Sequence, residues 1–352
     1  MIFPVSPPVR DVVRWGIIGC GDVTEVKSGP GFQKARGSQL VAVMRRNGAL
    51  AADYAKRHHV PRWYDDARAL VADPEVDAIY IATPPGSHLE LAQLVARAGK
   101  PCYVEKPMAR HAPECDAMIA ALAHANQKLF VAYYRRALPR FLKMRELLDS
   151  GVLGQITGVS YRMATSTPAN ADPAKNAWRV AAENSGGGLL LDVGSHLLDF
   201  LDFCFGPLED LHGRAARLAT TGEIEDTVAM TFRTSRGIVG TASWNFSSHV
   251  KEDLLEFTGT AGRASIVFFG TEPVRLETAR GVESFDIANP PHVAQPLIQT
   301  VVDDLLGRGT CPSTGESARR TSLVMDRVLD AYYGGRDDAF WKRPATWPGR
   351  NK

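Results

Sequence analysis

The sequence has no run of about 18 consecutive apolar residues, the length that crosses a bilayer, so we expect no membrane span. It also has little net charge, since 41 Lys and Arg against 39 Asp and Glu leave only +2, and no polybasic tract occurs. Nucleic acid and anionic membranes are therefore poor candidates for a binding partner. We find no internal repeat and no low-complexity segment.

Cysteines are few, odd in number and far apart, and no Cys-x-x-Cys pair is present. This spacing argues against a disulfide framework and against a structural zinc site, and it favours reduced thiols. The proline-containing first residues lack the basic and then apolar segments of a secretory signal, so we expect a cytoplasmic protein. The cysteines are Cys20, Cys102, Cys115, Cys204 and Cys311.

The chain is long enough for two domains: it has 352 residues, 45% of them apolar and 23% charged, which is an ordinary globular balance. The patterning changes near residue 133. We therefore expect a dinucleotide-binding domain over 1–132 and a substrate-binding and oligomerisation domain over 133–352. The sequence leaves open whether the C-terminal helix and tail pack back on the first domain.

Strand and helix patterns alternate in the first half of the chain. This alternation predicts a doubly wound parallel sheet with helices on both faces, an α/β domain of the Rossmann type. The expected strands are 12–18, 39–44, 76–82, 101–104 and 129–132, and the expected helices include 49–58, 88–98 and 113–125.

Longer strands without intervening helices dominate the second half. They predict an α+β domain with a large, open and mostly antiparallel sheet. The expected strands are 155–165, 226–234, 238–246, 253–259, 263–269 and 274–278, and the expected helices are 139–150, 194–205, 296–306 and 317–333.

A glycine-rich turn follows the first expected strand. Gly19 allows a tight turn, and Gly21 lets backbone N–H groups approach a pyrophosphate at the start of the next helix. The third glycine of the usual fingerprint is replaced by Thr24, and such turns also occur for steric reasons alone. The whole candidate turn is Gly19, Cys20, Gly21, Asp22 and Val23.

Two arginines, Arg45 and Arg46, follow the second expected strand, where NAD-selective enzymes usually carry an acidic residue for the ribose hydroxyls. A guanidinium can pair with a 2′-phosphate, so the pair favours NADP, with NAD as the other possibility. The alternative interpretation is a solvated basic turn.

Two further segments carry chemically active residues. Glu105-Lys106-Pro107 follows a buried strand and places a lysine at the carboxyl end of the sheet, where open α/β folds bind ligands. Asp192 and His196 are four residues apart, a spacing at which a helical carboxylate can orient an imidazole for acid–base work. A surface lysine, a capping aspartate and a core histidine are the plainer alternatives. Too few ligands are present for a metal site.

Taken together, these features resemble the Gfo/Idh/MocA family of nicotinamide-dependent oxidoreductases over residues 14–335. The resemblance implies that Lys106 contacts the substrate oxygen and the nicotinamide end of the cofactor, with Glu105 beside it, and that His196 is the general acid or base paired with Asp192. It also implies a homodimer or homotetramer built through the C-terminal sheet. A turn of Thr83, Pro84 and His88 would lie beside the cofactor.

The expected reaction is hydride transfer between NAD(P) and a secondary alcohol or ketone of a sugar, polyol or inositol. Arg136, in a Tyr-Tyr-Arg-Arg segment, and Trp178, in a polar loop over 166–184, are candidate substrate contacts. A tryptophan that anchors its own loop is an equal alternative. Two rival functions remain: an NAD-dependent glycosidase-like enzyme and a non-catalytic dinucleotide sensor on the same fold. The sequence leaves open whether Pro107 follows a cis peptide bond.

Overall fold

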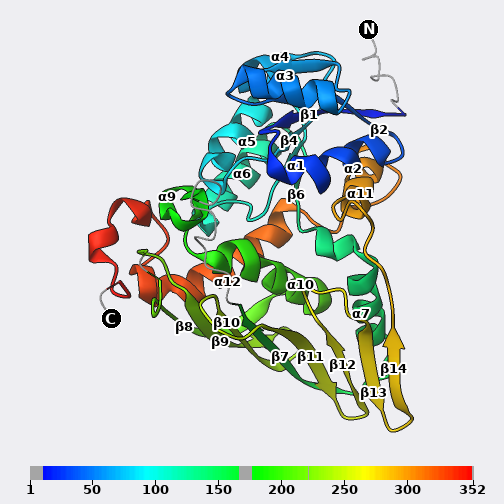
Figure 1. Cartoon of the computed structure of the whole chain (residues 1–352), viewed down its shortest axis with the longest axis vertical. Helices are drawn as coiled ribbons and strands as arrows, with labels where there is room; N and C mark the ends of the chain where they lie inside the picture. The colour runs from blue at the N-terminus through cyan, green and yellow to red at the C-terminus, as the bar shows by residue number, and fades with distance from the viewer. Residues whose placement is uncertain (1–10, 166–176, 221, 351–352) are drawn as a thin grey trace, which may run out of the picture.

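The computed structural model describes residues 11–165, 177–220 and 222–350. Within these residues the strands form two sheets, one of six strands and one of eight. Figure 1 shows the smaller sheet and its helices at one end of the molecule and the larger sheet at the other, with several helices between them. No helix among the described residues is long and apolar enough to cross a membrane.

The six-stranded sheet is parallel throughout and has the strand order β3-β2-β1-β4-β5-β6. Its centre is almost wholly buried, which is why its strands are continuous apolar runs. The strands are β1 (Val13–Ile18), β2 (Ser38–Met44), β3 (Arg62–Tyr64), β4 (Ala78–Ile81), β5 (Cys102–Val104) and β6 (Leu129–Val131).

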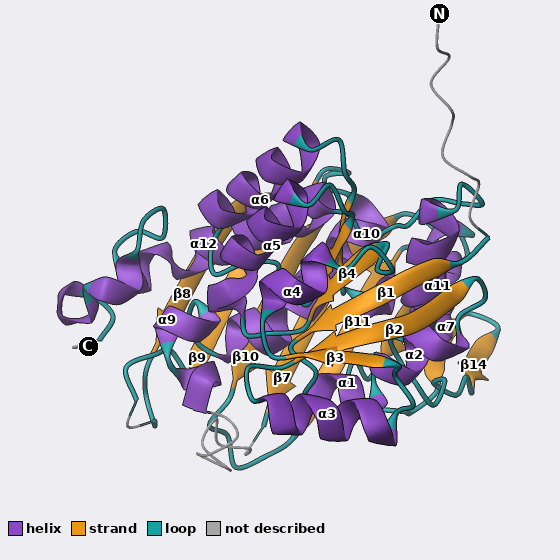
Figure 2. Ribbon diagram, turned by 90° about the horizontal axis from the view of Figure 1, so that it is seen from above, coloured by secondary structure: helices purple, strands orange, loops and turns teal. Residues whose placement is uncertain are grey.

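Helices cover both faces of this sheet and build a separate apolar core on each (Figure 2). One core receives side chains from α2 (Gly29–Lys34), α3 (Gly48–Arg57) and, from far along the chain, α11 (Gln295–Leu305). The other receives side chains from α4 (Ala67–Ala72), α5 (His88–Arg97) and α6 (Ala112–His124). The short helices α1 (Asp22–Val26) and η1 (Pro85–Ser87) follow β1 and β4.

The eight-stranded sheet has the order β14-β13-β12-β11-β7-β10-β9-β8. Every neighbouring pair is antiparallel except β7 and β10, which are parallel. The strands are β7 (Ile156–Ala164), β8 (Leu208–Ala216), β9 (Thr227–Thr234), β10 (Val239–Asn245), β11 (Glu252–Gly259), β12 (Gly262–Ile266), β13 (Val274–Thr278) and β14 (Gly281–Phe285).

One face of the larger sheet packs against helices that lie between the two sheets (Figure 1). They are α7 (Pro139–Asp149), α10 (Ser195–Phe205) and α12 (Gly315–Tyr333). The opposite face presents small and polar side chains in register, among them Thr231, Thr241 and Ser160. The remaining elements are η2 (Tyr134–Ala137), η3 (Ala177–Val180), α9 (Ala182–Ser185), the π-helix η4 (Leu190–Gly194), η5 (Phe340–Lys342) and η6 (Pro344–Thr346).

Helix α11 belongs in sequence to the second half but packs on the first sheet. Leu297, Ile298, Val301 and Val302 are fully buried there, in the same core as Phe32. Helix α12 likewise contacts α6 and β6 as well as α10 and β8. The C-terminal third of the chain therefore ties the two sheets together.

The fold class expected from the sequence is confirmed, and the strands that were not expected have a common explanation. β3, β8 and β14 all lie at sheet edges, and they bury few side chains. The first four residues of β14 are exposed. Edge strands of this kind lack the apolar run or strict alternation that identifies a strand in a sequence.

Candidate active site

The glycine turn after β1 has the geometry that close approach of a dinucleotide requires. Gly19 has φ +91°, and a Cβ there would lie 2.7 Å from the Thr83 methyl group. A Cβ on Gly21, at the start of α1, would meet only Gly19 O at 3.9 Å, so the space beside it is open. The turn is held by hydrogen bonds from the Gly19 and Cys20 N–H groups to Met44 O. These residues fit a dinucleotide pyrophosphate.

The side chains of Arg45 and Arg46 are exposed where β2 ends. Neither guanidinium has a hydrogen bond or ion pair to the described residues. Asn47 caps α3 immediately afterwards by accepting from Leu50 N–H. Both arginines are thus free to meet a ligand at the position that faces the adenosine ribose in Rossmann domains.

His88 has a different place from the one expected. It is fully buried, and its two ring nitrogens lie 2.7 Å from Thr83 O and 3.1 Å from Met108 O. Burial lowers its pKa. The expectation that His88 itself contacts the cofactor is wrong, because its ring has no surface left. It instead joins the turn after β4 to the turn after β5, and Thr83 and Pro84 remain at the surface of that junction.

Lys106 lies at the carboxyl end of β5, and its ammonium reaches across to the second sheet's helices. Nζ donates to Asp192 O at 2.7 Å and to Asp192 Oδ1 at 2.5 Å. The bond between Lys106 and Pro107 is cis. The preceding Glu105 accepts hydrogen bonds from Tyr80 OH and from Lys106 N–H, and desolvation raises its pKa.

Asp192 lies in the π-helical turn η4 and joins three segments of the chain. Its second carboxylate oxygen accepts from Arg179 Nε at 3.0 Å. Burial alone would raise the pKa of Asp192, but Lys106 and Arg179 outweigh it and lower the pKa to about 2. Within the described residues no hydrogen bond joins Asp192 to His196. The carboxylate therefore orients Lys106, where the sequence suggested that it orients the imidazole.

His196 is in the first turn of α10, only 4% exposed, and its Nδ1 has no hydrogen-bond partner among the described residues. Its ring makes edge-on contacts with Tyr133, Tyr134 and Phe269, at centroid distances of 6.1, 5.2 and 6.0 Å. Burial and then the positive charges of Arg135 and Lys106 hold its pKa well below the usual value. The imidazole is thus neutral at pH 7 and able to accept a proton.

The two neighbouring arginines of the Tyr-Tyr-Arg-Arg segment have opposite roles. Arg136 is 4% exposed and forms ion pairs with Asp199 and Asp202 at 2.8 and 2.9 Å. The expectation that Arg136 contacts substrate is wrong, because its guanidinium is consumed by this buried cluster. Arg135 lies over the Phe269 ring at 4.4 Å, and its Nε has no partner. The sequence offered nothing to separate the two.

The polar loop over 166–184 is only partly described, and residues 166–176 lie outside the described residues. In η3, which follows, Trp178 is half-buried and its ring lies 4.6 Å from the Arg179 guanidinium. Trp178 directly precedes Arg179 in the sequence, and Arg179 bonds to Asp192, the partner of Lys106.

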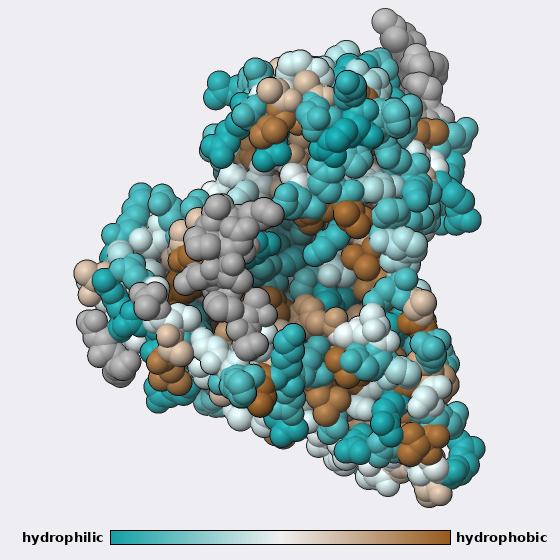
Figure 3. Space-filling view, viewed as in Figure 1, coloured by the Kyte–Doolittle hydropathy of each residue, from teal (hydrophilic) through white to brown (hydrophobic). Residues whose placement is uncertain are grey.

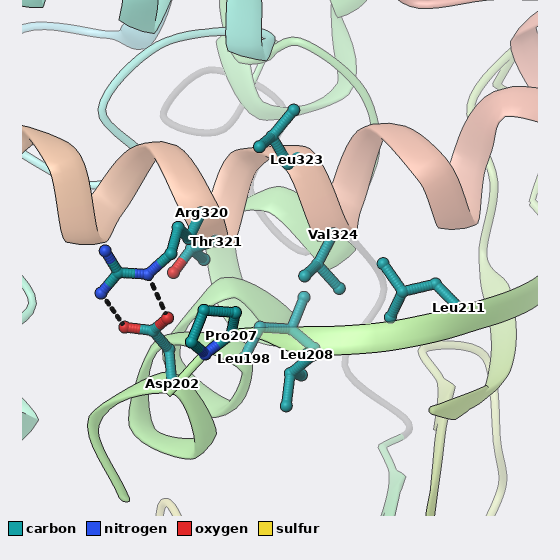
Figure 4. A pocket seen from close by; sticks show the side chains of 9 residues that line it. All are labelled: Leu198, Asp202, Pro207, Leu208, Leu211, Arg320, Thr321, Leu323 and Val324. Atoms are coloured by element: carbon teal, nitrogen blue, oxygen red, sulfur yellow. Dashed lines mark hydrogen bonds and ion pairs between the residues drawn. The ribbon is translucent and has the colours of Figure 1, made fainter. Parts of the chain in front are cut away.

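Lys106, Asp192 and Arg179 come together in one ion-paired group that joins the dinucleotide-binding sheet to the second half of the chain. Figure 3 shows the surface hollowed on one face of the molecule. A different pocket, shown in Figure 4, lies between α10, α12 and the start of β8. Its lining is largely apolar, and its two charged members, Asp202 and Arg320, are already paired with each other. Within the described residues no cluster of His, Cys, Asp and Glu is arranged to hold a metal ion.

A parallel sheet in the order 3-2-1-4-5-6, with a glycine turn after its first strand, is the arrangement of a dinucleotide-binding Rossmann domain. Comparison with known proteins gives the family. Residues 13–133 match the oxidoreductase family with an NAD-binding Rossmann fold, and residues 141–265 match the GFO/IDH/MocA C-terminal domain. The chain belongs to the Gfo/Idh/MocA family of oxidoreductases.

Relatives of known sequence agree with this placement. An oxidoreductase of Formosa agariphila is 36% identical over 316 residues, which is 89% of this chain and 97% of that protein. The 1,5-anhydro-D-fructose reductase of Ensifer adhaerens is 27% identical over 86% of this chain and 91% of its own length. Among solved structures, levoglucosan dehydrogenase in complex with NADH and levoglucosan has a TM-score of 0.80 at 21% identity, over 90% of this chain and 96% of that one.

Proposed function

We propose that this protein transfers hydride between a nicotinamide dinucleotide and a secondary alcohol or ketone of a sugar or polyol. The observation that carries the proposal is the contact of Lys106, from the dinucleotide-binding sheet, with Asp192, together with His196, which lies close enough for the Lys106 charge to help lower its pKa. A sensor that only binds dinucleotide need not keep a neutral buried imidazole together with a fixed ammonium.

The turn over Gly19–Val23 would hold the pyrophosphate, and Lys106 would lie at the nicotinamide end. The bound cofactor supplies or accepts the hydride. His196 accepts the hydroxyl proton during oxidation, because its lowered pKa keeps the ring neutral. Lys106 stabilises the negative charge that develops on the substrate oxygen. Reduction reverses these roles, with protonated His196 as the acid.

Asp192 acts on Lys106 in this scheme. Its ionised carboxylate holds the ammonium in place through Oδ1 and the backbone oxygen, and Arg179 holds the carboxylate from the other side. A lysine otherwise has a long flexible stem, so these contacts fix its charge at one point. Substrate contacts would come from Trp178, which is half-buried beside Arg179.

The preferred cofactor in this proposal is NADP. Arg45 and Arg46 are exposed at the end of β2, and neither is engaged by another described side chain, so both are available to a 2′-phosphate. Structural neighbours have been solved with bound NADH, so NAD(H) is kept as the alternative cofactor.

The neighbours also support the substrate class. Their solved complexes contain levoglucosan, L-sorbose and a UDP-linked sugar acid, and a relative reduces 1,5-anhydro-D-fructose. For assembly we propose a homodimer or homotetramer through the outer face of the eight-stranded sheet. That face presents in-register small polar residues, and no other described element of the chain covers it.

Two measurements test the function. Titration with NADP(H) and NAD(H) should give at least a tenfold lower Kd for NADP(H), and the double substitution Arg45→Ala, Arg46→Ala should remove that preference. Arg97→Ala, at the exposed last residue of α5, removes a similar charge elsewhere and should leave that preference intact. Tighter NAD(H) binding by the unaltered protein would overturn the NADP assignment.

The second measurement is a panel of sugars, polyols and sugar acids, followed by nicotinamide absorbance. At least one member should be turned over, and Lys106→Met should abolish turnover while leaving dinucleotide affinity within about threefold, since the phosphates bind elsewhere. Dinucleotide binding without turnover of any panel member would instead favour the sensor. Glycoside cleavage without net cofactor consumption would favour the glycosidase-like enzyme.

A further inference from the structure

The segment that carries Asp192 begins with three glycines, and the first two have positive φ, +84° at Gly186 and +152° at Gly187. A Cβ on Gly186 would lie 2.6 Å from Arg110 O and 2.7 Å from Arg110 Cα. The backbone of this segment therefore rests directly on the backbone that follows Lys106. The two halves of the site meet here without intervening side chains.

A single buried guanidinium fastens this contact. Arg336, three residues beyond α12, donates from Nη1 to Gly186 O and from Nη2 to Arg110 O, each at 2.7 Å. Gly186 is six residues before Asp192, and Arg110 is four residues after Lys106. One side chain thus bonds to both of the segments whose far ends form the Lys106–Asp192 pair.

Arg336 is itself held rigidly. Its Nε donates to Asp326 Oδ1 at 2.9 Å, its side chain is 1% exposed, and its guanidinium lies 4.5 Å from the Phe340 ring. Asp326 also accepts from Ala112 N–H at 2.7 Å, in the segment that follows Lys106. We call Arg336 and its hydrogen bonds to Gly186, Arg110 and Asp326 the clamp. A planar group with several donors in fixed directions suits this work, and lysine has no equivalent.

Glu225, which is held by Tyr333 near the end of α12, makes a second buried contact with the same glycines. Glu225 accepts from Gly188 N–H at 3.0 and 3.1 Å and from Tyr333 OH at 2.5 Å. A Cβ on Gly188 would lie 2.6 Å from Glu225 O, so the backbone has no freedom on this side. The position of the glycines is set by the C-terminal part of the chain.

We infer that Arg336 is a positioning residue for catalysis, which aligns the Lys106 and Asp192 segments from the C-terminal tail without touching substrate or cofactor. The inference rests on the proposed roles of Lys106 and Asp192. Displacing a reacting group by about 1 Å can lower a rate on the order of 100-fold, so the clamp governs turnover more than binding.

The test compares Arg336→Ala with Arg343→Ala. Arg343 lies in the same tail and bonds to Tyr333 O, Gly334 O and Gly335 O, but it reaches neither Gly186 nor Arg110. We expect Arg336→Ala to lower kcat about 10- to 100-fold with KM and dinucleotide Kd within threefold, and guanidinium ion at millimolar concentration to restore part of the turnover. Arg343→Ala should keep kcat and gain nothing from guanidinium.

Arg336→Lys keeps the charge with fewer donors, so its kcat should fall between those of Arg336→Ala and the unaltered protein. Hydrogen exchange gives a readout that needs no substrate. The backbone amides over 186–192 should exchange faster in Arg336→Ala than in the unaltered protein, and their exchange rates should not change in Arg343→Ala. If the unaltered protein turns over no panel substrate, the proposed function fails and this exchange result still decides the clamp.

Three outcomes would overturn the inference. They are unchanged kcat and exchange in a folded Arg336→Ala protein, equal losses in the Arg336 and Arg343 variants, and failure of both the Ala and the Lys variant to fold. The last would assign Arg336 to the stability of the whole protein.

Discussion

Replacing Asp192 by asparagine keeps the shape of the side chain and removes its charge. Lys106 and Arg179 then lose their common counter-charge. The pKa of the Asp192 carboxyl falls from an ordinary 3.8 to about 2 in the folded protein, and a shift of that size corresponds to about 2 kcal/mol of folding free energy at pH 7. The side chain is 24% exposed, so solvent screening makes this an upper figure.

The pH dependence gives the prediction its sign. Because the folded pKa is the lower one, the stabilisation is complete above pH ~4 and disappears as the pH falls towards 2. Chemical denaturation of the unaltered protein and of Asp192→Asn should therefore differ by about 1–2 kcal/mol at pH 7 and 5, and by clearly less at pH 3. Asp116→Asn, which breaks an exposed pair with Arg319, serves as the control and should change stability by about 0–1 kcal/mol.

The same variant should lower kcat by about 100-fold, because Lys106 loses the negatively charged partner that fixes its ammonium and keeps only neutral acceptors. Turnover is followed by nicotinamide absorbance with whichever panel substrate is active. The reasoning is refuted if Asp192→Asn has the stability of the unaltered protein at pH 7, or if the difference stays constant down to pH 3. Full turnover in the variant would refute only the claim that Asp192 acts on catalysis through Lys106.

Three further predictions follow from the geometry. Gly19→Ala should weaken dinucleotide binding at least tenfold in a fluorescence titration, since its Cβ would clash with Thr83 in a backbone conformation that alanine rarely adopts. Unchanged affinity would contradict the assignment of the glycine turn to the pyrophosphate. His196→Gln should lower kcat by about 10²–10⁴-fold, and the acid limb of the unaltered protein's oxidation profile should lie below pH 6.5, because burial and nearby cations lower the histidine pKa; a limb above 6.5 would argue against His196 as the base. Arg136→Met should cost about 3–5 kcal/mol in denaturation, since two buried aspartates lose their partner, while any folded fraction keeps the unaltered KM; a raised KM with unaltered stability would restore the substrate role.

Much of the dinucleotide-binding sheet could be predicted because its strands are buried on both faces. Their sequences are short apolar runs that end in turn residues, as in β4 followed by Thr83 and Pro84. Lys106 could be placed at the sheet's carboxyl end for the same reason, since the strand before it was recognisable.

The partners of those residues could not be predicted. Asp192 and His196 are four residues apart, which suggested a direct contact, but the π-helical turn and the pull of Lys106 and Arg179 direct the carboxylate elsewhere. Arg135 and Arg136 are adjacent and identical in type, and only the fold sends one to two aspartates and the other to an aromatic cluster. Arg336 is 150 residues from Gly186 along the chain, and no local pattern joins them.

The return of α11 to the first sheet bears on how the protein could be divided. A fragment that ends near residue 133 would lack Leu297, Ile298, Val301 and Val302, and the apolar surface around Phe32 would then face water. Such a fragment should aggregate or bind dinucleotide poorly, even though its sheet is formed entirely from its own residues. Exchange of dinucleotide-binding halves between relatives would need α11 to be exchanged with them.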